Sequence, residues 1–223
     1  MKAISKFDLC VIGAGSGGLS VAAGAAQMGA RVVLVEKGKM GGDCLNYGCV
    51  PSKALLSAAH KAHEMQDGKE FGIKQNGIDI NFGSVHNHVH DVIEGIAPHD
   101  SVERLQGLGV TVIKSKAKFL DERRVRAGSK IIMPRYTVIA TGSSAAIPNI
   151  PGLADIDYLT NENVFDLTRA PRHIVIIGGG PLGVEMAQAL KRLGSEVTIL
   201  ESKRLLPKSD HELAEVVSAQ LRK

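Results

Sequence analysis

Residues 7–18 read FDLCVIGAGSGG, an apolar run that ends in a glycine-rich turn. The apolar run predicts a buried strand, and the small residues after the turn predict a helix. A second strand is expected over residues 31–35, closed by Glu36. In this order of elements the glycines let the backbone approach a pyrophosphate, the helix N-terminus faces its charge, and the acid accepts ribose hydroxyls. Glycine-rich turns are common, so one such unit is only a weak indicator of a dinucleotide site.

The same pattern occurs again 165 residues further along the chain. Residues 173–177 form an apolar run that leads into a second glycine-rich turn, a helix to Leu193 and a strand that ends at Glu201. Gly13, Gly15, Gly18, Gly29 and Glu36 match Gly178, Gly180, Gly183, Gly194 and Glu201. Five matches at a single offset predict two dinucleotide sites in one chain.

Residues 41–53, GGDCLNYGCVPSK, place two of the three cysteines five residues apart, just before a strong helix former. Pro51 suits the first turn of a helix, where a missing N–H costs nothing. A thiol at a helix N-terminus lies near unpaired N–H groups and the positive end of the helix dipole, which stabilise the reactive thiolate. Lys53 adds a positive charge nearby. The pattern predicts a reactive dithiol or disulfide at Cys44 and Cys49.

Other roles for the cysteines fit less well. A structural disulfide is disfavoured because the loop is short and the chain shows no sign of export. A zinc site would need His60 and His63, but they lie about 16–21 Å beyond Cys49 along the same predicted helix. His86 and His90 share a face of a later predicted helix and flank its apolar stripe, so a solvated helix edge is expected there. No metal site is predicted.

Between the two glycine-turn units the chain is expected to alternate helices and short strands. The dithiol helix continues from Lys53 to Gln66, and another helix starts near Phe82. Short strands are expected over residues 110–113, 117–119, 124–126 and 130–133, with a turn at 127–128. Residues 136–143 are expected to form a buried strand that ends in a tight turn, residues 160–163 a helix start, and residues 210–223 a final helix.

The segment 41–53 resembles the redox-active signature of the pyridine nucleotide-disulfide oxidoreductases, which include dihydrolipoamide dehydrogenase, mercuric reductase and glutathione reductase. Residues 136–143, YTVIATGS, are similar to the segment by which this family passes from its FAD domain to its NAD domain, and a stiff linker follows at 147–152. The resemblance covers essentially the whole chain. It implies an α/β fold with two Rossmann-like dinucleotide-binding domains: an FAD-binding domain over residues 1–149, and an NAD(P)-binding domain over residues 150–223 that is incomplete in this chain.

The resemblance implies an FAD-dependent NAD(P)H dithiol/disulfide oxidoreductase of the dihydrolipoamide dehydrogenase or mercuric reductase type. Electrons from NAD(P)H would reach the Cys44–Cys49 disulfide through the flavin, with Cys49 as the flavin-side thiolate and Cys44 as the thiol that exchanges with substrate. Lys53 and Glu185 are expected to form an ion pair near the flavin. The expected cofactor-binding residues are Gly13, Gly15, Ser16, Gly17, Gly18, Glu36, Lys37, Gly42, Asp43, Ala117, Thr141, Gly142, Ser143, Gly178, Gly180, Gly183 and Glu201.

Glu201 favours NADH, because a carboxylate at this strand end accepts ribose hydroxyls and repels a 2′-phosphate. Lys203 and Arg204 follow it and could reach such a phosphate. The chain departs from the family pattern at Asp43, where a threonine is usual, and at residues 145–146, two alanines in place of a basic residue and proline. Family members are much longer, so this chain is expected to be an N-terminal portion. It is expected to be inactive alone, since the acid/base histidine and the homodimer-forming domain would lie in the remainder.

Composition narrows the function classes. The chain has 223 residues and a net charge of +4, and it shows no run of basic residues with interleaved aromatics, so nucleic-acid binding is not predicted. No stretch approaches about 20 uncharged apolar residues, so a membrane span is not expected and the protein should be cytoplasmic. Cys10 lies in an apolar run and is expected in the core.

The expected substrate is a small-molecule or protein-bound dithiol or disulfide, or a metal thiolate. Two alternatives from other classes remain open. A flavin monooxygenase can carry two fingerprints but has no role for the dithiol signature. A nucleotide-binding or redox-sensing module would bind cofactor without turnover.

Overall fold

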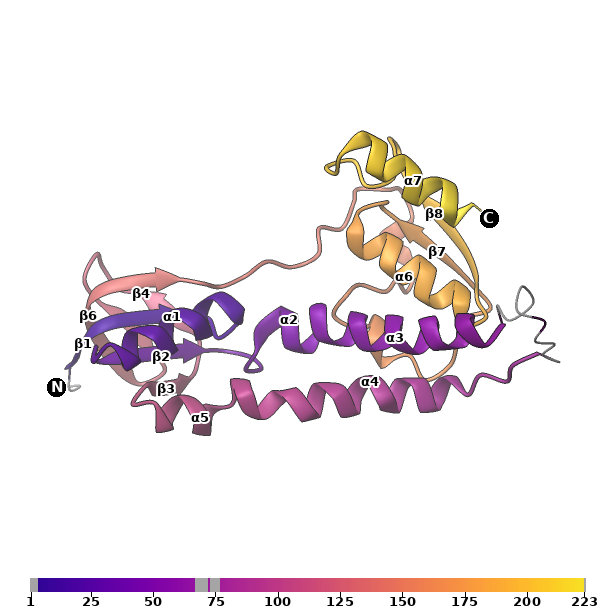
Figure 1. Ribbon diagram of the computed structural model, residues 1–223. Coiled ribbons are helices and arrows are strands. Elements are labelled where there is room, and N and C mark those ends of the chain that lie inside the picture. The colour runs from indigo at the N-terminus through magenta and orange to yellow at the C-terminus, as the bar shows by residue number, and fades with distance from the viewer. Residues whose placement is uncertain (1–3, 67–71, 73–76, 223) are drawn as a thin grey trace. The chain divides into compact units, whose positions relative to one another are not determined.

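The computed structural model describes residues 4–66, 72 and 77–222 of the chain (Figure 1). The chain divides into two compact units that each combine two segments distant in sequence. The first unit comprises Met1–Val50 and Asp91–Val164, and the second comprises Pro51–His90 and Phe165–Lys223. Both units are of the α/β class. The helices α3 (Cys49–Gln66) and α4 (Phe82–Ile96) each run across a boundary between the units.

The first unit is built on a mixed six-stranded sheet in the order β3-β2-β1-β6-β5-β4. Its strands are β1 (Ile4–Ile12), β2 (Val32–Glu36), β3 (Thr111–Lys114), β4 (Ala117–Phe119), β5 (Val125–Ala127) and β6 (Lys130–Ile139). The strands β3, β2, β1 and β6 are parallel, whereas β6, β5 and β4 are antiparallel neighbours. The crossover from β1 to β2 is α1 (Ser16–Gln27). A parallel pair cannot be joined by a tight turn, which is why this helix is required.

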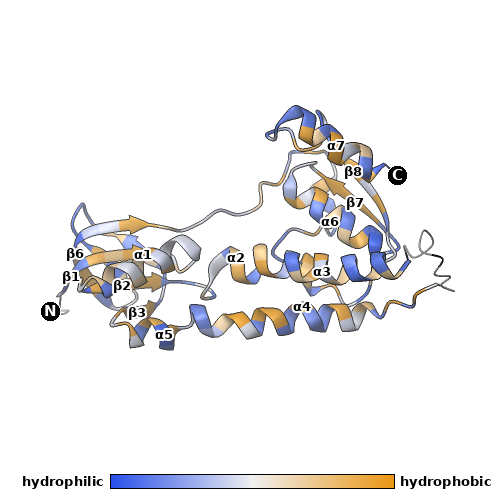
Figure 2. Cartoon of the chain, in the orientation of Figure 1, coloured by the Kyte–Doolittle hydropathy of each residue, from blue (hydrophilic) through white to orange (hydrophobic). Residues whose placement is uncertain are grey.

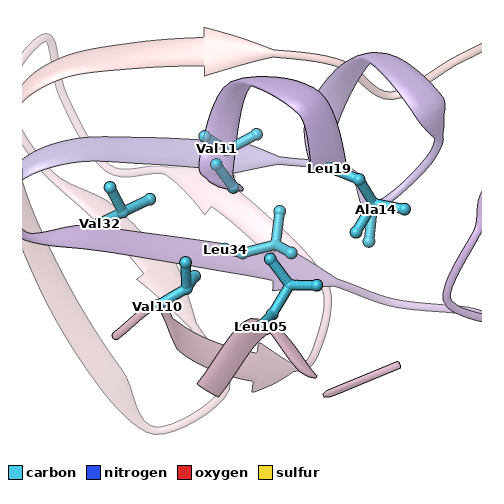
Figure 3. Close-up of a cluster of buried hydrophobic side chains, with 8 residues drawn as sticks. Val11, Ala14, Leu19, Val32, Leu34, Leu105 and Val110 are labelled. Carbon is cyan, nitrogen blue, oxygen red and sulfur yellow. The ribbon is translucent and has the colours of Figure 1, made fainter. Parts of the chain in front are cut away.

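The core of the first unit lies on both faces of β1 and β2, because successive side chains on a strand point to opposite faces. On one face, Val11 and Leu34 pack with Leu19 of α1 and Leu105 of the short helix α5 (Val102–Gly107) (Figure 3). On the other face Cys10 packs against β5 and β6. Cys10 is fully buried, as the sequence predicted, and burial raises the pKa of its thiol to about 11. Figure 2 shows these central strands as mostly apolar.

The second unit holds a two-stranded parallel sheet of β7 (His173–Ile177) and β8 (Glu196–Leu200), joined by α6 (Pro181–Arg192). The helix α7 (His211–Leu221) follows, capped by Asp210, whose carboxylate accepts hydrogen bonds from the N–H groups of Glu212 and Leu213. Alternate residues of β7 and β8 are exposed, among them Val175, Ile177 and Leu200. Lys223, the last residue of the predicted final helix, lies outside the described residues.

Most elements agree with the sequence prediction to within a residue or two, and the strand over residues 117–119 agrees at both ends. Two expectations about residues 130–140 were wrong. Residues 130–133 and 136–139 belong to one strand, β6, which continues through Pro134. Its second half is not buried, since Tyr136 is 62% and Ile139 is 66% exposed. Only Lys130, Ile131 and Ile132 pair with β5, so the remainder of β6 is paired along one edge, with β1.

The predicted helix start at residues 160–163 is also wrong. These residues form a turn, followed only by the 3-10 helix η4 (Val164–Asp166). The Asn163 carboxamide oxygen accepts a hydrogen bond from the N–H of Thr160, which closes the turn. Asn161 directs its side chain out of the turn toward another part of the first unit. Two asparagines with local or distant partners therefore override the capping pattern.

No described helix is both long and apolar enough to cross a membrane.

Candidate functional site

The first glycine turn joins β1 to α1 and brings backbone segments unusually close together. Gly13 has φ of 107°, and a Cβ there would lie 2.1 Å from the carbonyl oxygen of Ala140, at the end of β6. A Cβ on Gly18 would lie 1.8 Å from the carbonyl oxygen of Gly13. Both positions therefore require glycine. The N-cap of α1 is Gly15, with no side-chain cap and no acidic residue in the first turn. The positive end of the helix dipole is left for an anion.

Glu36 at the end of β2 folds back onto this turn. Its carboxylate oxygens accept hydrogen bonds from two backbone N–H groups, that of Ala14 at 2.6 Å and that of Gly38 at 2.5 Å. The sequence indicated an acid at this position but not that the backbone holds both of its oxygens. This arrangement fixes the carboxylate at the carboxyl end of the parallel strands, where ligands bind in open α/β sheets.

The second glycine turn repeats this geometry inside the second unit. Gly178 has φ of 108°, and a Cβ on Gly183 would lie 2.2 Å from the Gly178 carbonyl oxygen. The Glu201 carboxylate accepts from the N–H groups of Gly179 at 2.8 Å and Lys203 at 3.0 Å. Those donors lower the pKa of Glu201, the Gly179 N–H most strongly. Every position is offset by 165 residues from its counterpart, so the repeat seen in the sequence extends to individual hydrogen bonds.

The helix α6 likewise begins with a bare N-terminus. Its N-cap is Gly180, it has no side-chain cap, and Pro181 occupies its first turn. Each turn thus offers a helix N-terminus, backbone N–H groups and a fixed carboxylate, the combination expected for binding the pyrophosphate and ribose of a dinucleotide.

The loop that carries the cysteine pair begins directly beside the first glycine turn. The N–H of Gly41 donates to the carbonyl oxygen of Ala14 at 2.9 Å, and a Cβ on Gly42 would lie 2.5 Å from Cα of Gly15. Cys44 lies in a short helix that sequence reasoning missed, α2 (Gly42–Asn46), and Cys49 begins α3, as predicted. The dithiol loop, residues 41–49, therefore starts at the backbone of the nucleotide-type turn.

Both cysteines are thiols in this structure. Cys44 is half-buried and Cys49 is exposed. A hydrogen bond between the two thiols, followed by burial, raises the pKa of Cys44 to about 11. The Cys44 thiol therefore holds its proton at neutral pH. Cys49 is the first residue of an 18-residue helix. The unequal roles predicted for the two cysteines stay a prediction.

Side-chain amides hold the dithiol loop in shape. Asn46 donates to the carbonyl oxygens of Met40 at 2.9 Å and Gly42 at 2.8 Å. Asn161 donates to the Asp43 carboxylate at 2.8 Å and to the Tyr47 carbonyl oxygen at 3.4 Å. Sequence reasoning missed both asparagines. The position of Asn46 inside the cysteine segment was a usable signal, whereas nothing in the sequence linked Asn161 to a residue more than a hundred positions away.

In the second unit, Lys53 and Glu185 form the predicted ion pair. The Lys53 ammonium lies 2.8 Å from both carboxylate oxygens of Glu185, the fifth residue of α6. The Glu185 side chain is 33% exposed and that of Lys53 is 62% exposed. Lys53 also contacts the hydroxyl of Ser52 at 3.4 Å. An ion pair this exposed contributes little to stability.

The remaining predicted site residues fall into two groups. Ser16 and Gly17 open the first turn of α1, and Thr141 lies against the Gly13 turn through its backbone. Lys37, Gly142 and Ser143 are exposed, whereas Ala117 packs against the core cluster around Cys10. The structure thus brings the first fingerprint, Gly42 and Thr141 together.

These features define an α/β protein with two glycine-turn units and a dithiol next to one of them. A family model for pyridine nucleotide-disulphide oxidoreductases matches residues 7–223. The chain belongs to this family, as the sequence predicted.

Individual relatives agree with that assignment. The chain is 34% identical over 216 residues to a mercuric reductase of Bacillus cereus, covering 96% of this chain and 34% of the relative. It is 37% identical over 223 residues to a dihydrolipoyl dehydrogenase of Geobacillus stearothermophilus, covering 97% and 47%. The HOCl-induced flavoprotein disulfide reductase RclA of Escherichia coli, solved as its Cu(II) complex, has a TM-score of 0.80 at 28% identity, covering 96% and 46%. The chain spans less than half the length of each relative.

Proposed function

We propose that this chain is the nucleotide-binding and dithiol-bearing part of an FAD-dependent NAD(P)H dithiol/disulfide oxidoreductase. In this proposal residues 1–149 bind FAD and residues 150–223 begin the NAD(P)-binding domain. The substrate is a small-molecule or protein-bound disulfide, or a metal thiolate, and the full-length protein is a homodimer. The printed names of the relatives, mercuric reductase and dihydrolipoyl dehydrogenase, support this class of reaction.

One observation carries the proposal: the backbone of the dithiol loop packs against the backbone of the first glycine turn. Gly42 approaches Gly15 so closely that a Cβ at position 42 would lie 2.5 Å from Cα of Gly15. A dinucleotide whose pyrophosphate rests on the N-terminus of α1 would therefore begin beside the loop that holds Cys44 and Cys49. A structural cysteine pair would have no reason to start at this turn.

The residues present fit both cofactors. The N-terminus of α1 has no capping side chain or acid to compete with a pyrophosphate, and Glu36 is held where a ribose would lie. The N-terminus of α6 and Glu201 offer the same to a nicotinamide nucleotide. The flavin would relay the electron pair of the nicotinamide to a disulfide, chemistry that no side chain here supplies. The chain's own residues bind, orient and exchange thiols.

Within that scheme the two cysteines have separate tasks. Cys49, at the positive end of α3, would stabilise a thiolate on the flavin side. Cys44 would be the thiol that exchanges with substrate, and because its raised pKa keeps it protonated, a base would have to remove its proton before it attacks a disulfide. Lys53 and Glu185 would place a charge pair close to the flavin. NADH is the proposed nucleotide, because the Glu201 carboxylate stays ionised and disfavours a 2′-phosphate.

The proposed FAD site is tested with a substitution that should impair binding of FAD without disturbing the fold. Gly15 has φ of −79°, and a Cβ there would meet only Cα of Gly42, at 3.8 Å, so Gly15→Ala is compatible with the fold. A methyl at this N-cap would obstruct the close approach of a pyrophosphate. Gly24→Ala, later in α1, has open space within 4 Å and serves as the matched control.

FAD affinity is measured by quenching of flavin fluorescence, together with the melting temperature of each variant. We expect Gly15→Ala to weaken FAD binding by about ten-fold or more at an unchanged melting temperature, and Gly24→Ala to bind like the parent protein. Equal affinities in all three proteins would refute the proposed site. In the full-length protein with FAD, the cysteine pair is first oxidised to the disulfide, and NADH should then raise the alkylation of Cys44 and Cys49. Nucleotide binding without any gain in thiols would favour a non-catalytic redox module.

A further inference from the structure

Asn161 lies in the turn before η4, far in sequence from the dithiol loop, yet its side-chain amide bonds to that loop twice. The amide donates to the Asp43 carboxylate at 2.8 Å and to the Tyr47 carbonyl oxygen at 3.4 Å. These two acceptors stand on either side of Cys44, and all of these residues belong to the first compact unit. One side chain therefore spans the helix that carries a redox thiol.

The helix α2 needs such support. It has only five residues, its N-cap Gly41 is in the left-handed region at φ of 84°, and it has no side-chain cap. A helix of this length is not stable by itself, because nucleation is costly and few internal hydrogen bonds form. The Asn46 amide secures its beginning, through the carbonyl oxygens of Met40 and Gly42. Asn161 connects its beginning to its end.

The support matters most when the cysteines are reduced. Disulfide formation breaks two S–H bonds, forms one S–S bond, and delivers two electrons and two protons to an oxidant such as glutathione disulfide, which leaves as two thiols. The S–S bond then holds the loop covalently. In the dithiol state only non-covalent contacts keep the two sulfurs adjacent. Without the amide the reduced loop gains conformations, and the effective concentration of one thiol at the other falls.

We propose that Asn161 is a positioning residue that sets the dithiol–disulfide equilibrium of Cys44 and Cys49. The inference rests on the proposed function in one respect, that these cysteines are the redox pair. It gives Asp43 a task other than cofactor binding: its carboxylate is the charged acceptor of the Asn161 amide. A hydrogen bond to a charged acceptor is stronger than one between neutral groups, so removal of either partner should shift the equilibrium in the same direction.

The experiment equilibrates the purified protein with mixtures of reduced and oxidised glutathione. The reaction is then quenched with iodoacetamide, and the peptide with both cysteines is analysed by mass spectrometry. We expect Asn161→Ala to lower the equilibrium constant for disulfide formation by about three- to ten-fold, the usual worth of one such hydrogen bond. Asp43→Ala should lower the equilibrium constant by a similar factor. Because Asp43 is exposed, this variant tests the same hydrogen bond if Asn161→Ala folds poorly.

Three further variants distinguish positioning of the dithiol loop from a general loosening of the structure. Asn163→Ala removes an amide of the same kind two residues away that bonds only within its own turn, to the N–H of Thr160 at 2.7 Å, and it should leave the equilibrium within two-fold of the parent. Asn161→Asp sets two carboxylates against each other and should lower the constant. Adding Asp43→Asn to it restores a donor and an acceptor and should raise the constant again.

The outcomes separate the two ideas. If the parent protein forms the Cys44–Cys49 disulfide and Asn161→Ala forms it with the same constant, the positioning role is refuted and the proposed function stands. The same conclusion follows if Asn161→Ala and Asn163→Ala shift the constant equally. If the parent protein forms no such disulfide at any glutathione ratio, the proposed redox function fails first.

Discussion

Replacing Gly18 by alanine tests how tightly α1 is seated against the first glycine turn. The new Cβ would lie 1.8 Å from the carbonyl oxygen of Gly13 and 2.9 Å from its carbonyl carbon, both of them backbone atoms. Ordinary van der Waals contact begins near 3.4 Å. A flexible side chain could swing aside, but the Gly13 carbonyl cannot, because Gly13 is itself wedged against Ala140. The helix would have to shift by more than about 1 Å.

The magnitude follows from two opposing effects. Overpacking against a rigid neighbour costs about 3 kcal/mol, the upper end of its usual range. Alanine in place of glycine in a helix returns about 0.5–1 kcal/mol. The net loss should be about 2 kcal/mol, or about 4–8 °C in melting temperature for a chain of this size. Gly183→Ala should behave alike in the second unit, where the corresponding distance is 2.2 Å.

Gly24→Ala is the matched control, since a Cβ there meets no atom within 4 Å. The second glycine-turn unit already carries alanine at the position that matches Gly24. This residue, Ala189, is fully buried in α6. This variant should gain about 0.5–1 kcal/mol. Melting is followed by circular dichroism without added nucleotide, so that ligand binding does not contribute. A Gly18→Ala protein that melts at or above the parent temperature would show that the helix is not seated as described.

Three further predictions concern groups away from the glycine turns. Iodoacetamide at neutral pH should leave Cys10 unmodified until guanidinium unfolds the protein, because its pKa is raised to about 11 by burial; labelling of the native protein at Cys10 would contradict this. The pKa of Asp8 is lowered to about 2 by Arg31. The stability that this pair contributes is therefore complete above about pH 4 and is lost as the pH falls toward 2. The melting temperature of Asp8→Asn should consequently depend less on acid pH than that of the parent protein. Glu185→Gln should change the free energy of unfolding by less than about 1 kcal/mol, and in the full-length protein it should slow NADH-dependent thiol formation. If the variant unfolds instead, the ion pair with Lys53 has a structural role.

Sequence patterns predicted the local elements well, because short-range properties decide them. The two glycine turns, their helices and their terminal acids follow from residue types at fixed spacing, and the structure reproduces them at an offset of 165 residues. The position of Cys49 at the start of α3 follows likewise from Pro51 and the helix-forming residues after it. The Lys53–Glu185 pair came from family resemblance, and its contact within the second unit is confirmed. The roles assigned to cofactor-binding residues stay predictions.

Tertiary structure alone decided the features that depend on distant partners. That β6 is one strand with an open second half is set by how far β5 extends along it, which no pattern within residues 130–140 records. The turn at residues 160–163 has the composition of a helix cap, but Asn161 finds a better acceptor at Asp43, more than a hundred residues earlier. Hydrogen-bond capacity is a property of the residue, whereas the choice of partner depends on which backbone segments the sheet brings together. Local sequence therefore determined which elements form, and packing determined which side chains meet.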